Sequence, residues 1–328
     1  MNQFLLWRLL FFAVAVAAAS LAPPSEPFVL VAIAIAIWHG AFDGVLARPL
    51  LEPRLGSRWA PAFVFAYLAL AATVGLLWWS APRAALPLFL LYSAWHFGTE
   101  ADFGSFTPAS AVAGLSMGTI PIAAACYWHP VQVTAIFATM LGGLSMQSFA
   151  RAITQSAGLI LWIAVPMAIV GSMSGVRSKA ALVGLQLLLF WRCPPLLAFG
   201  VFFCAWHTPE HLFTSSVDAR GRFSPVLMWS QLRSGLIPWL ASLTALAAVV
   251  ALGPKNLTSY ASALFILLSA LTVPHLMLNE LRRRNSSASL TGARSLLPLP
   301  GTSLSNRKRT ASTQSDRADP QARPALFP

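Results

Sequence analysis

Ten long apolar runs constrain the fold of this chain more than any other feature of its sequence. Each run has roughly the 17 to 25 residues that a helix needs to cross a bilayer. Hydrophobic residues make up 57% of the 328 residues and charged residues only 10%, which is unusual for a soluble domain. The sequence predicts an all-α polytopic membrane protein of about eight to ten transmembrane helices, with spans near residues 4–22, 28–46, 60–80, 84–103, 108–127, 131–149, 156–174, 195–213, 235–252 and 258–280.

Two stretches do not fit this pattern of spans. Residues 180–193 are apolar but short, and Pro194 and Pro195 end them, so we expect an interfacial or re-entrant segment, with a full span as the alternative. Residues 282–328 are rich in Ser, Pro, Thr and Arg and cannot bury a core, which predicts a disordered basic tail after a helical domain of residues 1–281. We expect this tail to lie against anionic lipid, and the chain to bind no nucleic acid.

The distribution of arginines predicts an orientation in the plasma (inner) membrane. Positive residues concentrate on the cytoplasmic side, so the tail and a loop with three arginines at residues 48–58 belong there. With an even number of spans, both termini are then cytoplasmic. Arg177 and Lys179 fall outside in this arrangement, against the rule. The spans that hold His39, His96, His207 and His275 all run inward, which places these imidazoles at similar depth.

Histidines paired with polar residues four positions later are the strongest functional signal. Residues four apart share one helix face, and ionisable groups inside a membrane usually mark function. The pairs are His39 with Asp43, His96 with Glu100, His207 with His211, and His275 with Asn279. We expect a metal site with His39, His96, His207 and His211 as ligands. His275 is either a ligand or a supporting or substrate-contacting residue, and His129 is expected to be structural.

Acidic and aromatic residues surround these histidines. Asp43 and Glu100 either orient a metal-bound imidazole or form an interhelical hydrogen bond or an ion pair with a buried arginine. Asp102 and Glu210 belong to the same histidine motifs. Trp95, Trp206 and Phe97 either wall a slot for a long, planar, apolar substrate or pack as ordinary membrane aromatics.

Ligand type alone does not choose among zinc, copper, nickel and iron for an imidazole-rich site. A site buried in hydrocarbon and lined by aromatics favours oxidation of a lipid over hydrolysis of a water-soluble substrate. The alternative from another class is a transporter or metal permease, whose intramembrane His, Asp and Glu would line an ion path. A membrane di-iron desaturase is excluded, because six histidines with a single HxxxH motif are too few.

These motifs resemble those of the Brp/Blh family of bacterial and archaeal β-carotene 15,15′-dioxygenases. The resemblance rests on His39-Gly40-Ala41-x-Asp43, on Trp95-His96-Phe97-Gly98-x-Glu100-x-Asp102, on His207-x-x-x-His211 and on Pro274-His275, and it covers residues 28–280. It implies a helical membrane enzyme in which Fe(2+), bound by His39, His96, His207 and His211, supports the cleavage of β-carotene by O2 at the central double bond into two retinals. It also implies a retinal-binding rhodopsin as a product acceptor.

Overall fold

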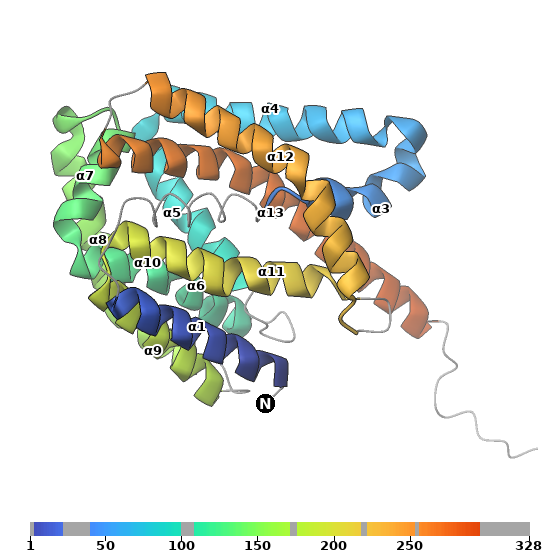
Figure 1. Ribbon diagram of the computed structural model, residues 1–328, viewed down its shortest axis with the longest axis horizontal. Helices are drawn as coiled ribbons and strands as arrows, with labels where there is room; N and C mark the ends of the chain where they lie inside the picture. The colour runs from blue at the N-terminus through green and yellow to red at the C-terminus, as the bar shows by residue number, and fades with distance from the viewer. Residues whose placement is uncertain are drawn as a thin grey trace, which may run out of the picture. The chain divides into compact units, whose positions relative to one another are not determined.

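The described part of the chain is almost entirely helical. The computed structural model describes residues 3–21, 40–99, 108–170, 176–217, 222–252 and 256–295. Within these ranges the strand-like pairing is limited to an isolated bridge between Val217 and Phe223. The chain divides into two units, Met1–Arg282 and Arg283–Pro328, and the helical bundle in Figure 1 belongs to the first. The predicted all-α class is confirmed.

Long apolar helices support the prediction of a membrane protein. By length and composition, four stretches among the described residues can cross a membrane: Asp43–Ser80, Pro108–Trp128, Leu144–Val170 and Leu257–Arg282. The α-helices are α1 (Gln3–Leu21), α3 (Asp43–Leu55), α4 (Trp59–Ser80), α5 (Pro82–Thr99), α6 (Pro108–Trp128), α7 (Pro130–Met140), α8 (Gln147–Val170), α9 (Val176–Arg192), α10 (Pro195–Phe202), α11 (Thr208–Ser215), α12 (Pro225–Leu252) and α13 (Leu257–Ser295). Short 3₁₀ turns, η2 (Gly56–Arg58) and η3 (Leu144–Met146), and a π-helical turn, η4 (Phe203–His207), complete the described elements.

The span predicted at residues 131–149 is wrong. Helix α7 ends at Met140 after 11 residues, and Gly142 and Gly143 follow with φ of 107° and 106°. These positive φ values are accessible mainly to glycine, so the Gly-Gly pair makes a sharp turn between α7 and α8. In Figure 1, α7 runs crosswise at one end of the bundle instead of along it.

Three other segments are helical over ranges that the sequence did not predict. Residues 180–192 belong to α9, a regular helix of 17 residues that packs along α1 and α6. The predicted loop at residues 48–58 is instead helical, formed by α3 and η2. At the C-terminal end, α13 continues to Ser295, past the predicted limit near residue 280. Residues 296–328 lie outside the described residues.

The crossing of α5 and α6 depends on small residues. A Cβ atom added to Gly98 would lie 2.0 Å from the carbonyl oxygen of Gly114, and one added to Gly118 would lie 1.9 Å from that of Ala94. Only glycine permits backbones to approach this closely, as in small-residue crossings of membrane helices. The crossing brackets His96, which lies between Ala94 and Gly98 on α5, and so fixes where this imidazole sits.

Candidate metal centre

Four buried imidazoles from separate segments of the chain meet in the bundle. His96 comes from α5, His207 from η4, His211 from α11 and His275 from α13, and each is at most 5% exposed. The ring centroids are 4.9 Å apart for His96 and His207, 5.2 Å for His96 and His275, and 4.9 Å for His211 and His275. Of the four ligands expected from the sequence, His96 and His207 are direct neighbours, and His211 joins them through His275. His39 lies outside the described residues.

His275 is central to this cluster, and both of its ring nitrogens have hydrogen-bond partners. Nδ1 lies 2.7 Å from Asp43 Oδ1, and Nε2 lies 2.9 Å from Asn279 Nδ2. A carboxylate only accepts, so Nδ1–H donates to Asp43 and Nε2 accepts from the Asn279 amide. Tyr67, which was not singled out from the sequence, donates its hydroxyl to Asp43 Oδ2 at 3.1 Å. This network fixes the tautomer and the orientation of the His275 ring.

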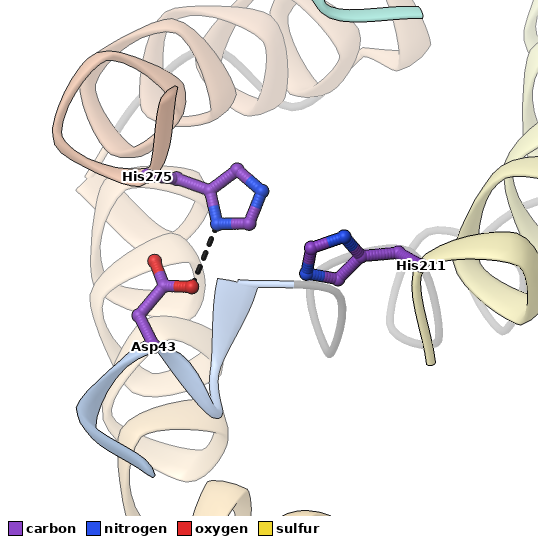
Figure 2. A group of neighbouring side chains, drawn as sticks. All are labelled: Asp43, His211 and His275. Carbon is purple, nitrogen blue, oxygen red and sulfur yellow. Dashed lines mark hydrogen bonds and ion pairs between the residues drawn. The ribbon is translucent and has the colours of Figure 1, made fainter. Parts of the chain in front are cut away.

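A second possible set of metal ligands contains two of the four imidazoles and one carboxylate. One ligand atom each from Asp43, His211 and His275 lie within 4.8 Å of one another, as Figure 2 shows, and all three residues are buried. Two imidazoles with one carboxylate are the ligand set of many non-haem Fe(II) oxygenases, and imidazoles alone also suit divalent iron. The donors present are of the types that bind divalent iron in either arrangement, and both arrangements use His211. The arrangement with Asp43 and His275 requires His275 to give up one of its two hydrogen bonds.

The π-helical turn η4 presents His207 to the cluster. Pro209, two residues later, cannot donate to the carbonyl of Ala205, and its ring would clash with that carbonyl in a regular α-helix. The wider π turn at Phe203–His207 accommodates the proline. Turns of this kind occur frequently at functional sites. The His207 ring contacts His96 and Phe97, while His211 stacks on Phe42 at 5.3 Å.

Glu210 and Trp206 face α1 rather than the imidazoles. The guanidinium of Arg8 binds the Glu210 carboxylate at 2.9 Å and lies 4.2 Å from the centroid of the Trp206 ring. Phe12 also contacts Trp206, at 5.7 Å. Of the two roles considered for Trp206, its contacts with Phe12 and Arg8 of α1 fit ordinary packing. Arg8, an arginine within an apolar segment, was the available signal for this buried ion pair.

A large apolar cavity opens beside the imidazoles. It has a volume of about 780 Å³, within the usual range for ligand sites, and Asp43, His96 and His275 form part of its wall. Phe97 lines it as expected, whereas Trp95 is half-buried on α5 and is absent from the described lining. A row of aromatic rings leads away from the cluster, with centroids 4.6 to 6.4 Å apart: His207, Phe203, Phe199, Phe265 and Phe89.

The remaining residues singled out from the sequence lie elsewhere. His129 hydrogen-bonds through Nε2 to the carbonyl oxygen of Phe190 at 2.7 Å, consistent with a structural role. Glu100 and Asp102 lie outside the described residues. The chemistry that the described groups offer is therefore a buried imidazole and carboxylate site at the wall of an apolar cavity.

Known proteins are similar in sequence to this chain over most of its length. Residues 30–281 match the family model described as beta-carotene 15,15'-dioxygenase. A probable beta-carotene 15,15'-dioxygenase Blh of Halobacterium salinarum is 25% identical over 299 residues, covering 80% of this chain and 85% of that protein. A beta-carotene 15,15'-dioxygenase of an uncultured marine bacterium is 25% identical over 273 residues, covering 78% of this chain and 93% of that protein. No solved structure matches. With a family match that includes every histidine of the buried cluster, the chain belongs to the beta-carotene 15,15'-dioxygenase family.

Proposed function

We propose that this protein cleaves β-carotene, or a close relative, at the central 15,15′ double bond. One molecule of β-carotene and one of O2 give two molecules of retinal, so that each carbon of the broken double bond becomes an aldehyde carbon. The observation that carries the proposal is the cluster of four buried imidazoles at the wall of an apolar cavity, in a chain of this family.

Iron(II) is the metal that we assign to the site. His96, His207 and His211 would hold it, together with His39 as the family resemblance implies. When bound, iron supplies the redox chemistry that lets O2 react with a polyene. The network of Asp43, Tyr67 and Asn279 holds the His275 ring in one orientation beside these ligands.

The alternative set of ligands, Asp43, His211 and His275, predicts different iron contents for two variants, and metal analysis can measure the difference. If His96, His207 and His211 bind the iron, His207→Ala removes most of the iron, while Asp43→Asn retains much of it. If Asp43, His211 and His275 bind the iron instead, the two variants behave in the opposite way. Iron per purified protein, measured by elemental analysis, decides between the two sets without reference to activity.

The apolar wall provides the binding and the exclusion of water that the reaction needs. The aromatic row from Phe203 to Phe89 offers flat surfaces to a conjugated chain. A long hydrocarbon gains about 25 cal/mol for each Å² that it removes from water, although a substrate arriving from lipid gains less. Retinal released into the bilayer would be available to a membrane-embedded acceptor such as a retinal-binding rhodopsin.

Expression in a carotene-accumulating bacterium tests the proposed function. Cells that produce this chain should lose their orange colour and yield retinal, while cells that produce the His211→Ala variant should stay orange. A metal permease, the alternative left open by the sequence, would instead give histidine-dependent metal uptake with unchanged carotene. Carotene that persists beside well-expressed, iron-loaded protein would refute the proposal.

We also propose that α9 crosses the membrane and that α7 does not. A helix of 11 residues covers about 16 Å and one of 17 residues about 25 Å, against a hydrocarbon core of about 30 Å. The number of spans remains even, so both termini stay cytoplasmic. Arg177 and Lys179 now fall on the cytoplasmic side, in agreement with the positive-inside rule, whereas Arg151 moves to the outside. Reporter fusions at residue 173 and after Leu281 should both report the cytoplasm.

A further inference from the structure

The exposed part of the cavity lining is confined to one side of the bundle. Lining residues on α5, α6, α7, α9, α10 and α13 are buried or half-buried. The exposed ones come from α3, α4 and α12: Arg48, Val64, Leu68, Ser230, Ser234, Ile237, Pro238 and Ala241. A residue that lines a cavity and is also exposed must stand at its opening. The opening therefore lies where α4 and α12 border the cavity.

Five of the eight exposed residues that line this opening are apolar, beside the polar Arg48, Ser230 and Ser234. Val64 is 51% exposed, Leu68 60% and Ile237 79%, and Ala241 is also exposed. The helix that carries Val64 and Leu68 belongs to the candidate span Asp43–Ser80. Exposed apolar residues on a membrane-crossing helix face lipid, because water would penalise them. The opening thus connects the cavity with the bilayer.

The imidazole site lies between two arms of the cavity. Along α13 the lining runs from His275 inward to Phe265, ten residues or roughly 15 Å of helix. Along α4 it runs the other way, from Tyr67, which bonds Asp43, to Trp59, eight residues or roughly 12 Å. Arms of similar length on either side of the site place the middle of a long occupant at the imidazoles.

We propose that a long apolar polyene enters this cavity sideways from the lipid, through a mouth between α4 and α12. One half of the polyene fills the inner arm beside Phe265, and the other half occupies the outer arm beside Phe63 and Trp59. This proposal rests on the proposed function, since it identifies how the same substrate reaches the same site. Ala60 on α4 and Ala241 on α12 are both small residues of the lining, so a larger side chain at either position would narrow the route.

Bulky substitutions in the mouth test this route, with matched controls on the same helices. Ala241→Trp and Ala60→Trp place an indole in the mouth. Ala245→Trp and Ala62→Trp place the same side chain at exposed positions, one turn along α12 and two residues along α4, outside the described lining. Each purified variant is measured for bound iron, for β-carotene bound in the absence of O2, where no cleavage can occur, and for the initial rate of carotene loss after O2 is added.

The mouth variants should retain normal iron, lose carotene binding and slow carotene loss by roughly tenfold, while both controls match the native protein. Normal iron shows that a variant has folded, and Ala241, being exposed, needs no core rearrangement. Normal binding and rate in both mouth variants would overturn the proposed route. If the native protein binds carotene without O2 but does not cleave it when O2 is added, the cleavage proposal fails and carotene binding still decides the route. If the native protein binds no carotene without O2, the route is refuted as well.

Discussion

Substituting Gly118 with alanine should disable the protein through a backbone contact, without changing any of the candidate ligands. The new Cβ atom would lie 1.9 Å from the carbonyl oxygen of Ala94 and 2.5 Å from the backbone nitrogen of Gly98. Ordinary contacts require more than 3 Å, so α5 and α6 must separate by about 1 Å. Overpacking of this kind costs about 1–3 kcal/mol of stability.

The shift also displaces His96, because Ala94 and Gly98 flank it on α5. A misplacement of about 1 Å at a reacting site lowers activity by about 10²-fold. We therefore expect Gly118→Ala to lower the Tm of the purified protein and to lower the rate of carotene loss by about 10²-fold. The iron content should also fall, since His96 is an expected ligand.

Gly184→Ala is the matched control for this substitution. Gly184 lies on α9, and a Cβ atom added there meets nothing within 4 Å. Alanine is favoured over glycine in a helix by up to about 1 kcal/mol, so this variant should be as stable as the native protein or more so, with unchanged activity. Equal behaviour of Gly118→Ala and Gly184→Ala would refute the idea that the α5–α6 crossing positions His96.

Three further substitutions test residues that are not expected iron ligands but that support the candidate metal centre or the helices around it. Arg8→Ala removes the guanidinium that binds the buried Glu210 carboxylate and should lower the free energy of unfolding by about 3–5 kcal/mol. The exchange Arg8→Glu with Glu210→Arg should recover part of this loss in thermal melts, and no recovery would argue against the ion pair as the cause. Asn279→Ala removes the donor to His275 and should weaken iron binding about 10-fold in a chelator titration, whereas unchanged affinity would exclude a supporting role. His129→Ala loses one hydrogen bond, worth about 1 kcal/mol, and should keep its iron; loss of iron would mean that His129 is not purely structural.

The sequence predicted the class of fold and the clustering of the histidines, because both depend on features that lie within single helices. Apolar runs long enough for a bilayer specify helices, and a polar residue is costly inside them unless it has partners. His96, His207, His211 and His275 come together as their shared depth predicted. The break between α7 and α8 was also readable, because the pair Gly142-Gly143 is a strong turn signal inside an apolar run.

The partners of individual side chains were not readable, because they depend on helices that are distant in the sequence. Glu210 binds Arg8, 202 positions away, and Tyr67 binds Asp43 from the next helix. From the sequence, Glu210 was only known to belong to the motif that contains His207 and His211, and its partner on α1 could not be predicted. The direction in which a buried carboxylate points depends on which cation packs beside it, and for Glu210 that cation is Arg8 of α1.

Product analysis with purified, iron-loaded protein tests the central claim most directly. Detergent-solubilised native protein is given β-carotene and O2, and the extracted products are separated by chromatography. The account predicts two molecules of retinal for each β-carotene consumed, and no reaction by the His207→Ala variant. Apocarotenals of unequal length would contradict central cleavage, and unchanged β-carotene beside iron-loaded native protein would contradict the proposed function altogether.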